Sequence, residues 1–152
     1  MIGVIAGDII GSIHEHGLMK SIDFPLFDPL SRFTDDTVLT VATAYAILTG
    51  TPYEVAYRDF GRQYPHAGYG GSFYNWLLAA DPRPYNSWGN GSAMRVAPVG
   101  LAFGNVQDVL FEAERSAVVT HNHVEVSKAP RPPRLRCSWR APAPRRARSE
   151  MT

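Results

Sequence analysis

The sequence predicts an all-α fold, and three observations support this prediction. Helix start and stop signals recur along the first 125 residues, no segment shows the apolar–polar alternation typical of strands, and the apolar content is 45%. A chain of 152 residues has room for one domain around a single core. We therefore expect one soluble helical domain.

The N-terminal stretch 2–14 predicts an apolar helix. Gly3, Gly7 and Gly11 repeat every four residues, which places them on one face where another backbone could approach closely. The stretch carries Asp8, lacks a basic leader and is too short to cross a bilayer. We expect a buried helix and not a signal peptide or a membrane helix.

A loop over 16–33 and a second helix over 35–48 follow. The loop contains two prolines and has no clear period. Thr34 or Asp35 is the expected N-cap of the helix, and Gly50 stands where a C-terminal glycine is favoured. The interior of this helix is apolar nearly all round, which predicts that it is buried.

Further signals predict four more helical segments. Thr51 to Glu54 reads as a capping box with proline at the first helical position, and it predicts a helix reaching about Tyr64. Ser72 is the expected cap of a short helix through Ala80. The remaining two are a helix from about Ser92, broken near Pro98, and a helix over 106–119 capped by Asn105.

Charge divides the chain into two segments. Residues 1–125 contain 7 Lys/Arg and 13 Asp/Glu, whereas residues 126–152 contain 8 Lys/Arg and 1 Asp/Glu. The second segment has seven arginines, five prolines and no helical or strand period, so its composition cannot support a packed core. Two interpretations remain: a disordered basic tail that binds nucleic acid or acidic surfaces, or out-of-frame translation, which we favour.

The single cysteine, Cys137, excludes an internal disulfide framework and a multi-cysteine zinc site. No uninterrupted apolar stretch is long enough to span a membrane. We therefore expect a cytoplasmic protein without a membrane partner.

The stretch Thr34 to Thr37 places two adjacent carboxylates between two hydroxyl groups. Such hard oxygen donors suit magnesium or manganese, and at a helix start neighbouring side chains can converge on one point. Taken alone, however, the tetrapeptide is more often a simple helix cap with acidic residues in the first turn.

A glycine-bracketed turn over Trp88 to Arg95 leads into a helix. Its backbone N–H groups could form an anion site for a phosphate or diphosphate, although, taken alone, the pattern favours an ordinary turn capped by Ser92. Elsewhere, Asp8 and Glu15 are seven residues apart, so a continuous helix would place them on one face. Asp8 could face a pocket or be satisfied by backbone groups. Thr120 to His123 predicts a polar loop at a helix end.

The order and spacing of these motifs resemble the ADP-ribosylglycohydrolase family over about residues 2–125. The chain reads Gly-x-x-x-Gly-Asp-x-x-Gly-x-x-x-Glu from Gly3, then Thr-Asp-Asp-Thr from Thr34, then Gly-Asn-Gly-Ser-Ala-Met-Arg from Gly89, then Thr-His-Asn-His from Thr120. The second and third motifs together are specific. The resemblance implies an orthogonal multi-helix domain that hydrolyses the glycosidic bond between ADP-ribose and a protein or small-molecule acceptor.

The resemblance also implies roles for individual residues. Metal ligands for two Mg²⁺ or Mn²⁺ ions would be Thr34, Asp35 and Asp36, and catalytic residues would be Glu15, Asp35 and Asp36. Residues that contact ADP-ribose would be Ser87, Trp88, Gly89, Asn90, Gly91, Ser92 and His121.

One departure from the family concerns the metal site, which in the family needs a later Asp-x-Asp-Thr motif. No such motif follows Asp36, and the resemblance stops near Glu125. We therefore expect a partial domain over 1–125, at most weak metal binding and an impaired hydrolase. The alternatives are a non-catalytic binder of ADP-ribose and, less favoured, a nucleic-acid binder that uses the basic tail.

Overall fold

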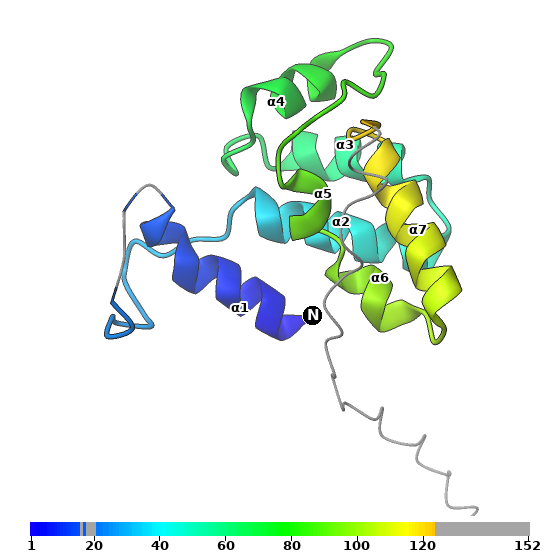
Figure 1. Cartoon of the computed structure of the whole chain (residues 1–152). Coiled ribbons are helices and arrows are strands. Elements are labelled where there is room, and N and C mark those ends of the chain that lie inside the picture. Colours follow the sequence, from blue (N-terminus) through cyan, green and yellow to red (C-terminus); the bar gives the residue numbers. More distant parts are fainter. Residues whose placement is uncertain (16, 18–20, 124–152) are drawn as a thin grey trace, which may run out of the picture.

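The computed structural model describes residues 1–15, 17 and 21–123, and this part of the chain is helical with no strand (Figure 1). The all-α prediction is therefore confirmed. The predicted basic tail over 126–152 lies outside the described residues. The helices are α1 (Ile2–Gly11), the short 3-10 helix η1 (Ser12–His14), α2 (Asp35–Thr49), α3 (Tyr53–Gln63), α4 (Gly71–Leu78), α5 (Gly91–Met94), α6 (Ala97–Ala102) and α7 (Val106–Val118).

Helix α2 is the centre of the fold and contacts α1, α3, α5 and α6. Its N-cap is Thr34, whose hydroxyl accepts a hydrogen bond from the Asp36 N–H at 3.3 Å. It ends at Gly50, which has a left-handed φ of 72° that favours glycine. Both predicted ends of this helix are confirmed because capping depends on a few adjacent residues.

The core lies where α2, α3 and α4 pack together. Aromatic and aliphatic side chains fill it: Leu39, Ala42, Ala46, Tyr53, Ala56, Tyr57, Phe73, Trp76 and Leu77. The helices α3 and α4 approach closely at Gly61, where an added Cβ would lie 2.6 Å from Leu77 Cδ2. The predicted burial of α2 is confirmed for six of its residues, although Leu48 remains 84% exposed.

Two predicted N-caps are wrong. Helix α3 begins after Pro52 without a side-chain cap, because the Thr51 hydroxyl hydrogen-bonds the Thr49 hydroxyl at 2.8 Å instead. Helix α4 begins at Gly71 and has Gly70 as its N-cap, so Ser72 lies inside the first turn and does not cap the helix.

The predicted break near Pro98 separates α5 from α6. Proline has no N–H to donate to the carbonyl four residues earlier, which is that of Met94. The Thr40 hydroxyl of α2 hydrogen-bonds this carbonyl instead, at 3.3 Å. Helix α7 is capped as predicted by Asn105, whose side chain accepts from the Asp108 N–H at 2.9 Å.

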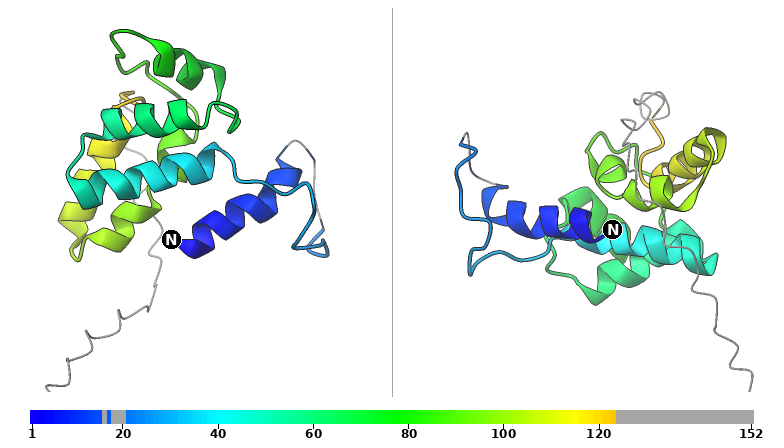
Figure 2. Two further views of the ribbon diagram at one scale, coloured as in Figure 1. Left: turned by 180° about the vertical axis from the view of Figure 1, so that it is seen from behind. Right: turned by 90° about the horizontal axis from the view of Figure 1, so that it is seen from below.

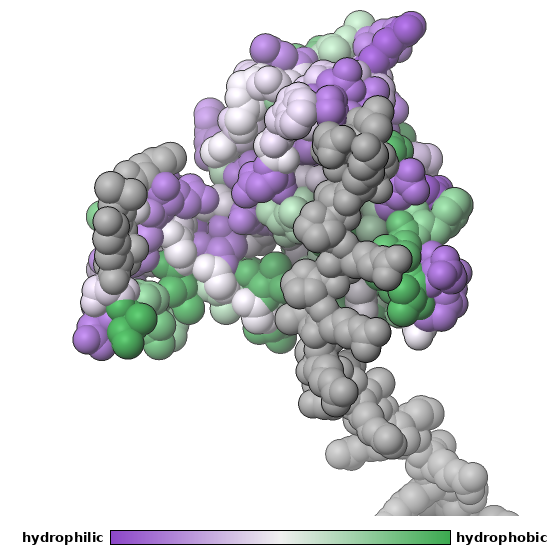
Figure 3. Space-filling model, viewed as in Figure 1, coloured by the Kyte–Doolittle hydropathy of each residue, from purple (hydrophilic) through white to green (hydrophobic). Residues whose placement is uncertain are grey.

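The prediction that the N-terminal helix is buried is wrong. No residue of α1 is buried, and Ile2 is 85% exposed. With the segment 21–33, α1 projects from the remaining helices in all three views (Figures 1 and 2). Hydrophobic residues are visible along this projection (Figure 3). Among the described residues α1 packs against α2 and η1 and none of its residues is buried, so its apolar sequence does not lead to burial.

The glycine stripe of α1 does not receive another backbone in the described part of the chain. Nothing lies within 4 Å of the Cβ positions of Gly3, Gly7 or Gly11. The four-residue spacing puts these glycines on one face of the helix, but no described element packs against that face.

Candidate functional site

A cleft of about 430 Å³ lies between the starts of α2 and α4, the loop before α5, and the end of α7. Its lining consists of Asp35 and Leu39, residues Gly70 to Phe73, the continuous stretch Tyr85 to Gly91, and Met94, Arg95 and His121. The fold thus gathers residues from four separate stretches of sequence around one cavity.

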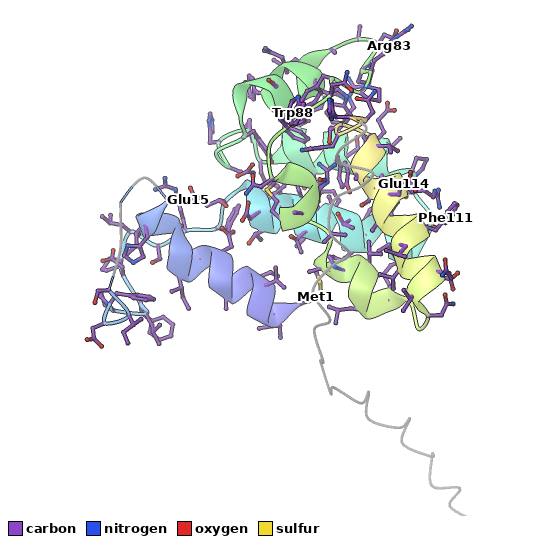
Figure 4. The ribbon with its side chains drawn as sticks, in the orientation of Figure 1. Met1, Glu15, Arg83, Trp88, Phe111 and Glu114 are labelled. Atoms are coloured by element: carbon purple, nitrogen blue, oxygen red, sulfur yellow. The ribbon has the colours of Figure 1, made fainter. Side chains whose placement is uncertain are left out.

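Some predicted site residues meet in this cleft and others do not. Asp35, the loop Ser87–Gly91 and His121 all line it. The remaining predicted residues, Thr34, Asp36, Ser92 and Glu15, are not among its lining residues. Glu15 is exposed at the end of the projecting helix pair, and Figure 4 shows it on a different part of the molecule from Trp88.

Asp8, which lies far from α2 in the sequence, hydrogen-bonds directly to the start of that helix. Its carboxylate accepts hydrogen bonds from the Thr34 N–H at 2.8 Å, the Thr34 hydroxyl at 2.6 Å, the Thr37 N–H at 3.2 Å and the Thr37 hydroxyl at 2.5 Å. The side chain is therefore satisfied by backbone and hydroxyl groups and does not face the cleft. Together these bonds fix the two hydroxyl residues on either side of Asp35 and Asp36.

The carboxylates of Asp35 and Asp36 carry unfavourable negative charge. Burial raises the pKa of Asp35 to about 7, and the charges of Asp36, Glu15 and Asp8 add to this increase. Burial likewise raises the pKa of Asp36, with further contributions from Asp8 and Glu15. A nearby cation would relieve this repulsion.

The described residues fit a divalent cation only in part. The two carboxylates are hard oxygen donors of the kind that Mg²⁺ prefers. The Thr34 hydroxyl already donates to Asp8 and accepts from Asp36, which reduces its capacity as a ligand. In the part of the chain that the structure describes, no three His, Cys, Asp or Glu side chains come close enough to hold a metal ion.

The loop over Tyr85 to Gly91 is held by the segment that follows α7. The Asn86 N–H donates to the Asn122 side chain at 2.8 Å, and the Ser87 N–H donates to the Thr120 carbonyl at 3.2 Å. His121 Nε2 lies 3.1 Å from the Gly89 carbonyl oxygen. Each residue from 120 to 122 therefore contacts a different residue of the loop.

Arg95 is fully buried below this loop, with 0% exposure. Its Nη2 donates to the Ser116 carbonyl at 3.0 Å and to the Thr120 hydroxyl at 2.8 Å. The guanidinium stacks over the Tyr57 ring at 4.1 Å. Burial lowers the pKa of Arg95, and the Tyr57 and Tyr85 hydroxyl groups oppose this decrease.

Trp88 forms an aromatic surface on the cleft. It is 73% exposed, and its ring centroid lies 3.9 Å from that of His123. The contact leaves most of the indole accessible, so a flat ligand could stack on it.

Reasoning from the sequence did not identify several cleft residues. Tyr85 and the stretch Gly70–Phe73 were not predicted as site residues, and Arg95 was named only as the last residue of the glycine-bracketed turn. A usable signal existed for Arg95, because it is a lone charge within the apolar stretch Ala93–Val99 and a charge in such a place needs specific partners. No local signal marked the other residues.

None of the helices in the described ranges is long and apolar enough to cross a membrane.

A family model described as ADP-ribosylglycohydrolase matches residues 1–129. The chain is 29% identical to the ADP-ribosylhydrolase ARH3 of Mus musculus and 30% identical to that of Bos taurus, over 78% of this chain and 42% of each relative. It is 25% identical to the ARH3 of Xenopus tropicalis, over 80% of this chain and 43% of that relative. The chain thus spans less than half the length of these relatives, and it belongs to the ADP-ribosylglycohydrolase family.

Proposed function

We propose that the cleft binds the ADP-ribose unit of an ADP-ribosylated protein or small molecule, and that the chemistry associated with it is hydrolysis of the glycosidic bond to the acceptor. The observation that supports this most strongly is the meeting of Asp35, the Ser87–Gly91 loop and His121 around one cavity. These residues come from motifs far apart in the sequence. Family membership and the similarity to ADP-ribosylhydrolases are consistent with the same function.

The cleft has properties suited to a nucleotide-like ligand. Its volume of about 430 Å³ lies in the range of small-molecule sites, about 300–1,000 Å³. The exposed residues Trp88, Gly89 and Asn90 combine an aromatic face with accessible backbone groups. Stacking of a base on such a face contributes about 1–3 kcal/mol. We therefore place the adenosine part of the ligand near Trp88.

The proposed metal is Mg²⁺ or Mn²⁺, bound weakly by Asp35 and Asp36. Their raised pKa values are the electrostatic reason to expect a cation there. A bound divalent ion would stabilise charge that develops at the ribose during bond cleavage. Because no three His, Cys, Asp or Glu side chains of the described residues come together there, we expect most of the coordination sphere to be water.

We expect the 152-residue chain by itself to bind ADP-ribose and to hydrolyse its linkages slowly at best. This follows from the partial metal site and from Glu15, which the resemblance implies to be catalytic and which does not line the cleft. Release of ADP-ribose from an ADP-ribosylated protein, with and without MgCl₂, measures the activity. Turnover at a rate typical of enzymes, about 1–1,000 per second, would contradict the expected impairment.

Binding is tested by titrating ADP-ribose into the full chain in a calorimeter. Trp88→Ala should weaken binding, because it removes the exposed ring from the cleft. Phe111→Ala is the matched control, since Phe111 is 62% exposed on α7 and does not line the cleft. Figure 4 labels both residues. Equal affinities of the two variants, or no binding by the unsubstituted chain, would contradict the proposed function.

The alternative of nucleic-acid binding depends on residues 126–152, which lie outside the described residues. It predicts DNA binding with steep salt dependence that is lost when these residues are deleted. The cytoplasmic location remains a prediction from cysteine usage.

A further inference from the structure

We propose that Arg95 acts through Thr120 to fix His121 as its Nε2–H tautomer, and that this one-directional chain of hydrogen bonds holds the Gly89 carbonyl and the cleft loop in place. Arg95 and Thr120 would thus be positioning residues. Neither is a catalytic residue in this proposal. This chain of hydrogen bonds links three places in the fold: Arg95 directly after α5, Thr120 just beyond α7, and Gly89 in the loop between α4 and α5.

The direction of the chain is set at Arg95. A guanidinium can donate hydrogen bonds and cannot accept them. The Thr120 hydroxyl, 2.8 Å from Arg95 Nη2, must therefore act as the acceptor of that bond. Its only hydrogen is then free for its second partner, His121 Nδ1, at 2.7 Å. A distance this short between an oxygen and a nitrogen requires a hydrogen between them.

The tautomer of His121 follows from this direction. Because Nδ1 accepts from Thr120, the hydrogen of the neutral ring must be on Nε2. Nε2 lies 3.1 Å from the Gly89 carbonyl oxygen, which can only accept. In the other tautomer, Thr120 would receive two donors and the Nε2 lone pair would face the carbonyl oxygen. One arrangement of hydrogens satisfies every contact.

Burial favours this arrangement of hydrogens. Arg95 and Thr120 have 0% exposure and His121 has 3%, so water cannot readily replace a lost partner. A buried polar group without a partner is unfavourable. A reversed or broken chain would leave at least one such group.

The loop depends on the ring that this chain orients. A Cβ on Gly91 would lie only 3.1 Å from His121 Cε1, so the ring packs directly on the backbone of the loop. The neighbouring bonds from Asn86 and Ser87 to residues 122 and 120 hold the same loop on the same segment. Rotation of the ring would therefore disturb the loop that lines the cleft.

The tautomer can be measured without any ligand. In the ¹⁵N-labelled full chain at pH 7, nuclear magnetic resonance of the histidine side chains distinguishes protonated from non-protonated ring nitrogens. Comparison with His121→Gln assigns the signals. We expect a protonated Nε2 and a non-protonated Nδ1 for His121. A protonated Nδ1, or an exchanging mixture of both tautomers, would overturn the proposal.

Two variants test the role of Thr120. Thr120→Val keeps the shape and removes the hydroxyl, whereas Thr120→Ser keeps the hydroxyl. We expect Thr120→Val to give a mixture of His121 tautomers and Thr120→Ser to restore the single Nε2–H form, with unchanged helical content in circular dichroism. A single Nε2–H form in both variants would show that the chain from Arg95 does not set the tautomer.

The consequence for ligand binding rests on the proposed function. With ADP-ribose as the probe, Thr120→Val should bind about tenfold more weakly, and Thr120→Ser should bind as the unsubstituted chain does. If the unsubstituted chain shows the expected tautomer and binds no ADP-ribose, the proposed function fails while the hydrogen-bond chain stands. If Thr120→Val changes the tautomer and leaves affinity unchanged, the positioning role is refuted.

Discussion

The carboxylate of Asp8 accepts two hydrogen bonds from Thr34, one from its N–H at 2.8 Å and one from its hydroxyl at 2.6 Å. The same carboxylate binds both corresponding groups of Thr37. The two threonines enclose Asp35 and Asp36, so a side chain of α1 determines the conformation of the acidic pair. The first prediction follows from this relationship.

We predict that Asp8→Asn lowers the free energy of unfolding by about 2–4 kcal/mol, because hydrogen bonds to a charged acceptor are strong and the amide NH₂ would face donors. Asp59→Asn is the matched control, since Asp59 is exposed on α3. Urea unfolding monitored by circular dichroism measures both variants. Equal stabilities of the two would show that the four bonds to Asp8 are not important for the fold.

The second prediction concerns the contact between α3 and α4. We predict that Gly61→Ala destabilises the chain by about 1–3 kcal/mol, because the new Cβ would lie 2.6 Å from Leu77 Cδ2 and Leu77 is only 1% exposed. Gly100→Ala in α6 should instead stabilise by about 0.5–1 kcal/mol, since nothing lies within 4 Å of its Cβ position. Thermal unfolding of the two variants should show a lower melting temperature for Gly61→Ala and a higher one for Gly100→Ala than for the unsubstituted chain.

The sequence predicted helix ends better than contacts between helices. Caps at Thr34, Gly50 and Asn105 were predicted correctly from a few adjacent residues, whereas the equally local predictions at Thr51 and Ser72 were wrong. The close approach of α3 to α4 at Gly61 was not predicted, because it depends on how two helices cross. The predicted close approach at the glycines of α1 was wrong for the same reason.

The candidate site was predictable to a similar degree. Local patterns and the family resemblance identified Asp35, the Ser87–Gly91 loop and His121, and the fold brings these together. The contribution of Gly70–Phe73 and Tyr85 could not be read from the sequence, since their own patterns carry no chemical signal. Burial was the other failure: an apolar helix such as α1 is buried only where other elements cover it.

The third prediction concerns the charge of Asp35. We predict that Asp35→Asn raises the stability of the metal-free chain at pH 7 by about 1–2 kcal/mol, because burial and the neighbouring carboxylates disfavour the charged form. The same substitution should abolish any rise in melting temperature caused by MgCl₂, since a ligand that binds only the folded state stabilises it. Asp59→Asn should retain that rise. A response to MgCl₂ in Asp35→Asn equal to that of the unsubstituted chain would exclude Asp35 as a ligand.

The last prediction is a pH dependence set by His121. Burial and the charge of Arg95 lower the pKa of His121 to about 4, although the hydrogen bond with Gly89 opposes the decrease. In the unfolded chain the ordinary value is about 6.5. Above pH 6.5 the ring is neutral in both states. Between pH 6.5 and 4 the unfolded state binds a proton that the folded state does not, so stability must fall on acidification by about 1.4 kcal/mol per unit at most.

The difference in stability between the unsubstituted chain and His121→Gln isolates the contribution of His121. Asp35, whose pKa is raised to about 7, has the opposite influence in the same range, because its folded form binds a proton that the unfolded form has lost. Subtracting the stability of His121→Gln from that of the unsubstituted chain at each pH removes the contribution of Asp35. The difference should decrease from pH 6.5 to 4. A flat difference for His121 would mean that its ring accepts a proton in the folded chain as readily as in the unfolded one, and that Thr120 and Arg95 do not prevent it.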